Sequence, residues 1–226
     1  MKIKRVRKNL NKNKIFFETV FVFIASISAI YISFQANSIA ENQGKIMEWE
    51  NTPNLEIRKT QIYNDSLKIY DRTIWLVYNH NSKISNFDIE KDYSFLNFSF
   101  KNTTDSIRLP INNYINLGGR VYGTSEGLIY DFDDKYTGYS KYLLWNSLFD
   151  IGYLDIESYI KISYKTVLGK SEKKYFQILP SIKEIDSLNW SELERFHIKN
   201  NTETLYINNT TSNQLRIKLL KMRRKQ

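Results

Sequence analysis

Cysteine is absent from this 226-residue chain, and histidine, proline and glycine are scarce, with two, three and eight residues. Without cysteine the chain has no disulfide framework, no thiolate nucleophile and no cysteine-based metal site. A histidine triad or a zinc site would need His80 and His197, far apart in sequence, to meet in the fold. We expect His80 in an exposed turn and His197 at a helix C-terminus. The sequence therefore predicts no metal and no cofactor.

Acidic residues are missing from both ends of the chain, which as a whole carries a formal net charge of +9. Residues 1–14 contain seven cations and residues 215–226 contain six. The 200 residues between them are therefore mildly acidic. A body of that charge lacks the broad basic face that nucleic-acid binding requires, so nucleic acid is an unlikely partner.

One hydrophobic run stands out, IFFETVFVFIASISAIYISF at residues 15–34. As a helix it is about 30 Å long, the thickness of the hydrocarbon core of a bilayer. The apolar region of a secretory signal is shorter, at roughly 7–15 residues. The run predicts a retained transmembrane helix. A signal sequence cleaved after Ala40, behind the small residue Ser38, and a helix buried in a core remain as alternatives.

The charges that flank this run predict its orientation. Residues 1–14 are purely cationic, whereas the segment after the run has Lys45 against Glu41, Glu48 and Glu50. Lysine and arginine beside a span resist translocation, so the N-terminus is expected in the cytoplasm and the rest of the chain outside. In a bacterial cell this means a single-pass protein of the inner (cytoplasmic) membrane.

Residues 35–52 continue the helix as a polar stalk, which Pro53 ends. An apolar edge of this stalk could rest on its own domain or pair with a second copy. The edge has the heptad-like spacing of a short coiled coil. It consists of Ile32, Ala36, Ile39, Gln43 and Ile46.

Residues 53–214 predict an antiparallel β-sandwich of about seven to nine strands with a few short helices, so the chain is mainly β. TIWLVYN at residues 73–79 and YSFLNFSF at 93–100 are rich in aromatic and β-branched residues. The first predicts a central strand. Pro110 marks an edge strand or a bulge, and Gly169 lies in the turn of a hairpin.

The aromatic residues suggest where the core of this sandwich lies. We expect Trp75, Phe98 and Trp145 inside it, because each lies in an apolar pattern. Trp190 begins a helix and is the tryptophan of the domain that we expect to be most exposed. Trp49 belongs to the stalk.

Short helices are expected at residues 139–149 and after S-x-x-E capping boxes that begin at Ser181 and Ser191. TETLYIN at residues 202–208 and NQLRIKLL at 213–220 predict a final pair of strands. In the second segment, apolar residues alternate with cations.

Two segments carry a resemblance to other proteins. FQANSIAENQ and TPNLEI directly follow the hydrophobic run, and ISYKTVLGKSEKKYFQI comes later. Together they resemble uncharacterised bacterial single-pass membrane proteins with an N-terminal anchor and an all-β soluble domain. The resemblance implies an anchored all-β domain and provides no catalytic residue.

A glycine-rich stretch at residues 116–127 and the acidic stretch that follows it are the candidate recognition loop. The glycines lack the spacing of a phosphate-binding or dinucleotide-binding loop, and the aspartates lack the spacing of an EF-hand. A solvated loop, a calcium site and catalytic carboxylates are the alternatives. The candidate residues are Arg120, Tyr122, Asp131, Asp133 and Asp134.

The cationic tail, residues 215–226, is expected to begin as a strand and to end in solvent. Arg223, Arg224 and Lys225 are candidate contacts with an anionic membrane surface, and a plain solvated end is the alternative.

Three classes of function fit these observations. The first is a membrane-anchored binding module of the cell envelope, which acts on another envelope protein or a ligand without catalysis. The second is an oligomeric membrane-associated effector or envelope-complex subunit that assembles through the span and stalk. The third is a hydrolase that uses the aspartates at positions 131–134.

Overall fold

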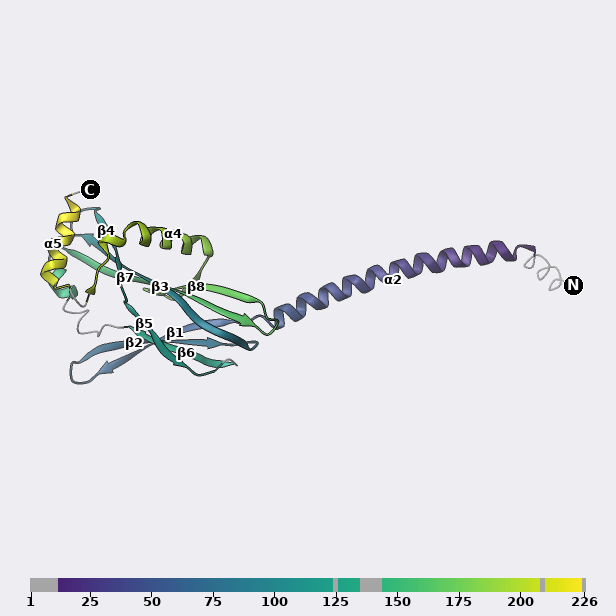
Figure 1. Ribbon diagram of the computed structural model, residues 1–226, viewed down its shortest axis with the longest axis horizontal. Helices are drawn as coiled ribbons and strands as arrows, with labels where there is room; N and C mark the ends of the chain where they lie inside the picture. Colours follow the sequence, from purple (N-terminus) through teal and green to yellow (C-terminus); the bar gives the residue numbers. More distant parts are fainter. Residues whose placement is uncertain (1–11, 124–125, 135–143, 208–209, 225–226) are drawn as a thin grey trace. The chain divides into compact units, whose positions relative to one another are not determined.

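The computed structural model describes residues 12–123, 126–134, 144–207 and 210–224. The chain forms two compact units, Met1–Glu50 and Asn51–Gln226 (Figure 1). The predicted domain boundary between stalk and body, at residues 52 and 53, therefore lies within three residues of the observed one.

The first unit includes a long helix, α2 (Lys14–Glu50), which joins the predicted span and stalk without a break. It is long and apolar enough to cross a membrane, and none of its residues is buried. It ends three residues before Pro53, because the residue before a proline disfavours the helical conformation. Lys45 and Glu41 form an ion pair across one turn of the stalk part.

The second unit is a sandwich of two antiparallel sheets, which confirms the predicted fold class. The four-stranded sheet has the order β1 (Leu55–Asn64), β2 (Ile69–Asn79), β6 (Gly127–Asp134), β5 (Ile115–Val121). The five-stranded sheet has the order β4 (Ser106–Ile111), β3 (Ile84–Phe100), β7 (Gly152–Thr166), β8 (Ser171–Leu179), β9 (Lys183–Ile185). Residues 73–79 lie in the interior strand β2, Pro110 lies in the edge strand β4, and Gly169 lies in the β7–β8 turn, as predicted.

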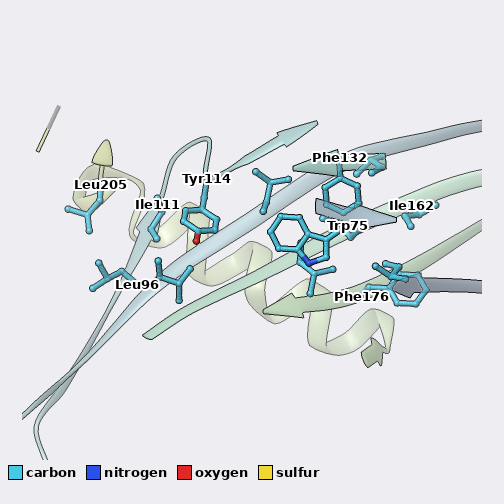
Figure 2. Close-up of a cluster of buried hydrophobic side chains, with 14 of the residues drawn as sticks. Trp75, Leu96, Ile111, Tyr114, Phe132, Ile162, Phe176 and Leu205 are labelled. Atoms are coloured by element: carbon cyan, nitrogen blue, oxygen red, sulfur yellow. The ribbon is translucent and has the colours of Figure 1, made fainter. Parts of the chain in front are cut away.

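The core lies between the two sheets. Trp75 of β2 is fully buried and stacks on Phe132 of β6, with 5.4 Å between the ring centroids. Figure 2 shows both rings beside Ile162 and Phe176 of the five-stranded sheet. Phe98 is also fully buried, so the predictions for Trp75 and Phe98 are confirmed.

A helix, α4 (Ser187–Lys199), covers the outer face of the five-stranded sheet (Figure 1). Its Trp190 and Leu193 pack in a second apolar cluster with Tyr93 and Phe95 of β3. The prediction that Trp190 is exposed was wrong, because this residue is only 4% exposed. Trp190 lies on the side of α4 that packs on the outer face of β3. The local sequence around Trp190 does not show that this partner surface exists.

Both predicted capping boxes were misplaced. Asp186 caps α4 by accepting a hydrogen bond from the backbone N–H of Asn189, so the helix begins before Ser191. The segment after Ser181 forms the edge strand β9 instead of a helix. The predicted helix at residues 139–149 is described only from residue 144, and residues 144–148 are helical.

Trp145 belongs to that helical segment, and its predicted place in the core was wrong. The side chain is 42% exposed, and its indole N–H donates to the carbonyl oxygen of Leu154. An apolar pattern around a tryptophan therefore did not distinguish a core residue from one at the rim.

The predicted final strand pair was also wrong. Residues 201–203 form a short 3-10 helix, η1 (Asn201–Glu203), and Leu205 makes an isolated parallel bridge to Ile111 of β4. The tail forms a helix, α5 (Ser212–Arg223), with a capping box between Thr211 and Gln214. Leu215 and Leu219, one turn apart, are buried in the main core. Leu215, Ile217 and Leu219 alternate as in a strand, but Leu215 and Leu219 are also four residues apart, which places them on one face of a helix. The capping box favours the helix over the strand.

Candidate functional site

Four of the five residues of the predicted recognition loop lie in paired strands, and Tyr122 directly follows β5. Arg120 belongs to β5 and Asp131 to β6, and the Asp131 carboxylate accepts hydrogen bonds from the backbone N–H of Arg120 and from the hydroxyl of Tyr122. A Cβ at Gly119 would lie 1.5 Å from the carbonyl oxygen of Asp131, so the close approach of the strands requires glycine there. Gly119 thus serves strand pairing, and a recognition role of the candidate residues stays a prediction.

The two remaining aspartates of that set are buried and satisfied from within the sheet. Asp133 pairs with Arg72 and accepts from the side-chain amide of Asn116 at 2.8 Å. Asp134 accepts from the backbone N–H of Thr73 at 3.3 Å. Among the described residues, no group of three histidine or carboxylate side chains is placed to hold a metal ion. These aspartates therefore function as sheet residues.

The candidate membrane contacts of the tail have different surroundings. Arg223 donates from Nε to Asp105 at 2.9 Å, and its guanidinium lies 4.7 Å from the ring centroid of Phe100. Its charge is therefore partly offset within the domain. Arg224 follows α5 as its C-cap, and Lys225 lies outside the described residues. Contact of these residues with lipid stays a prediction.

A polar cleft runs between α4 and the outer face of the five-stranded sheet, with a volume of about 460 Å³. That volume is within the range of about 300–1,000 Å³ that is usual for small-molecule sites. We call it the α4 cleft. Its polar lining comes from β4, β7 and β8, from β9 and from α4, and includes Arg108, Glu157, Tyr159, Gln177, Lys183 and Glu192.

One side of the α4 cleft is a fixed network. The Arg108 guanidinium donates to Glu157 at 2.5 Å, and the Tyr159 hydroxyl donates to the same carboxylate oxygen at 3.0 Å. The guanidinium carbon lies 4.3 Å from the ring centroid of Phe95 and 5.2 Å from that of Phe196. An arginine held between two rings and a carboxylate is restricted in orientation.

Burial also affects the Tyr159 hydroxyl of this network. Burial, with a contribution from the neighbouring Glu157 carboxylate, raises the pKa of Tyr159 to about 12. The hydroxyl therefore remains a hydrogen-bond donor at physiological pH. The Nε of Arg108 is buried without a hydrogen-bond partner among the described residues. This side of the cleft can therefore orient a ligand through groups that the protein holds in place.

The other side of the α4 cleft presents free charges. Among the described residues, neither Lys183 nor Glu192 takes part in an ion pair, and the Asn189 side chain has no hydrogen bond. Gln177 also lines the cleft, and its side-chain amide N–H donates to the carbonyl oxygen of Leu179 at 2.9 Å. A ligand would thus meet an ammonium group, a carboxylate and two amides.

Neither histidine contributes chemistry to the α4 cleft. The His197 ring packs 4.8 Å from the ring centroid of Tyr93, and burial lowers its pKa, so it remains neutral. His80 is exposed at the end of β2 and pairs with Glu56. The predicted structural roles of both histidines agree with these contacts.

The sequence alone could not identify the α4 cleft. Arg108 and Phe196 are 88 residues apart, and only the packing of α4 brings them together. A weak signal does exist in β7, where polar Glu157 and Tyr159 alternate with the buried residues of the inner face. That pattern indicates a half-covered outer face without showing what covers it.

Comparison with known proteins adds no relative. The chain matches no protein-family model, no curated protein and no solved structure. The resemblance to bacterial single-pass membrane proteins stays a prediction.

Proposed function

We propose that this chain is a membrane-anchored binding module of the bacterial cell envelope, with α2 in the inner membrane and the sandwich outside the cytoplasm. The apolar half of α2 and the seven cations of residues 1–14 support this arrangement. The proposed module binds a ligand or partner and carries out no reaction.

The observation that carries this proposal is the pair of unpaired opposite charges in the α4 cleft, Lys183 and Glu192, beside the fixed network of Arg108. Both side chains are exposed and unpaired among the described residues, so a polar partner that carries both charges would meet an opposite charge at each of them. A catalytic interpretation would require a group in the cleft that is suited to proton transfer, whereas burial raises the pKa of Tyr159 to about 12.

A photoreactive amino acid placed at Asn189, in the full-length protein in its native membrane, should form an adduct of discrete mass on irradiation. The matched control is Leu188, the preceding residue, which is exposed and does not line the cleft. Reversal of charge in Lys183→Glu should remove the adduct at 189. Equal labelling at 188 and 189, or labelling at 189 that is unaffected by Lys183→Glu, would contradict the proposal.

A second candidate is self-assembly through the stalk. The exposed apolar edge of α2, with Ile32, Ile39 and Ile46 each more than half exposed, favours it. Two helices that pair along such an edge bury it in a short coiled coil. In the same experiment, the photoreactive residue at Ile39 would then join two copies of the chain, whereas at Glu41, on another face of the helix, it would not.

A further inference from the structure

A second, smaller pocket lies between the two sheets and is separate from the α4 cleft. Its volume is about 280 Å³. The four-stranded sheet contributes residues of β1, β2 and β6, and the facing side comes from β7 and the end of β8. We call it the inter-sheet pocket. Its aromatic and polar lining includes Lys59, Gln61, Tyr70, Asp134, Trp145 and Asp155.

Two aromatic side chains of this pocket are open to solvent. Tyr70 is 61% exposed and Trp145 is 42% exposed. The indole of Trp145 is held by its hydrogen bond to Leu154, at 2.5 Å, and Tyr70 is held by edge-to-face contact with Tyr63, 5.2 Å between centroids. Both rings are therefore positioned by the protein while a face or edge remains available to a ligand.

Hydrogen-bonding groups surround these rings. Lys59 and Gln61, on the β1 side, have no side-chain partner among the described residues. Asp155, on the β7 side, accepts one hydrogen bond from the backbone N–H of Ile156, at 2.9 Å, and keeps its second oxygen free of any such bond among the described residues. The pocket thus offers an ammonium donor, an amide that donates and accepts, and the carboxylate acceptor of Asp155.

We propose that the inter-sheet pocket binds one ring of a saccharide. A sugar ring has an apolar C–H face that packs on an aromatic ring, and a rim of hydroxyls that both donate and accept. Such hydroxyls satisfy the Asp155 carboxylate, the amide of Gln61 and the ammonium group of Lys59 together, without a charge on the ligand. A phosphorylated ligand fits less well, because Asp134 and Asp155 oppose its charge and only Lys59 offsets it.

The size of the pocket supports one ring instead of a whole oligosaccharide inside it. About 280 Å³ is at the lower limit of ordinary ligand sites, and the exposed rings leave room for a chain to continue into solvent. This proposal does not depend on the α4 cleft, so either site could bind while the other does not.

The test uses the full-length protein in lipid nanodiscs, because sugar-based detergents would compete for the pocket. The probes are immobilised neutral oligomers of glucose, mannose, galactose and N-acetylglucosamine. We expect at least one oligomer to bind, and we expect Trp145→Ala and Tyr70→Ala each to weaken that binding about tenfold or more through loss of the stacked ring. Trp145→Phe should retain most of the binding.

Two further variants make the result decisive. Tyr153→Ala removes an exposed tyrosine that does not line the pocket and should leave binding unchanged. Gln61→Ala keeps both rings, so it tests the polar side even if an aromatic variant fails to fold. Absence of binding to every oligomer, or equal binding by wild type, Trp145→Ala and Gln61→Ala, would overturn the proposal.

Discussion

Replacement of Trp75 by alanine should destabilise the domain by about 3–5 kcal/mol, which is usual for a large aromatic residue in a core. The side chain is fully buried and stacks on Phe132, so its loss leaves a cavity between the sheets. The measurement is urea unfolding of the domain fragment 51–226, which contains the entire sandwich core. A loss below about 1 kcal/mol would contradict the observed core.

Two control variants separate the cavity from other effects. The Trp75 indole N–H is buried without a hydrogen-bond partner among the described residues, so Trp75→Phe loses volume but also removes an unsatisfied donor. We expect Trp75→Phe to cost much less than Trp75→Ala. Trp145→Ala, at an exposed tryptophan, should cost no more than about 1 kcal/mol.

Asp92→Asn should stabilise the domain above pH 7, by up to about 3 kcal/mol. Asp92 lies opposite the fully buried Ile160 in the β3–β7 pairing, two residues before the buried Ser94. Alternation therefore directs its side chain between the sheets. Burial raises the pKa of Asp92 from 3.8 to about 6, and no described residue forms an ion pair with it.

The direction of the pH dependence follows from that shift. The pKa of the folded state lies above that of the unfolded state, so the folded protein binds the proton more tightly. The stabilisation is fully present below about pH 4 and is lost as the pH rises through about 6. The asparagine variant should lack this loss, because its side chain does not ionise.

The pH dependence can be measured by urea unfolding of both proteins from pH 4 to pH 8. The lowered pKa of Glu56, from 4.5 to about 2 through Arg58 and His80, changes stability only below about pH 5 and is common to both proteins, so it cancels in the difference between the two curves. Curves for wild type and Asp92→Asn that remain parallel across the range would show that Asp92 is not buried as a carboxylic acid.

Much of the fold was predictable because its signals are local. The hydrophobic run at residues 15–34 specifies a helix by length alone, and alternation around Phe98 identifies the inner face of β3. The same alternation did not predict that Tyr93 and Phe95, on the outer face of β3, are buried as well. Their burial depends on α4, which is about 90 residues later in the chain.

The errors share that physical origin. Trp190 is buried because the distant strand β3 covers it, whereas Trp145 is partly exposed. The residues next to each tryptophan in the sequence do not indicate either outcome. The tail was predicted as a strand from three alternating residues, whereas the capping box at Thr211 decides for a helix. The candidate sites depend on the same long-range packing, so the aspartates that looked like a loop in sequence are strand residues.

We propose that the domain is anchored and lies outside the cytoplasm. Because the chain has no cysteine, this arrangement can be tested directly with single introduced cysteines. Single cysteines at Leu67, exposed in the β1–β2 turn, and at Lys8, in the N-terminal segment, can be treated with a membrane-impermeant maleimide in intact spheroplasts. We expect Leu67→Cys to react at once and Lys8→Cys to react only after the cells are lysed. Reaction of Lys8→Cys in intact spheroplasts, with protection of Leu67→Cys, would contradict the proposed orientation.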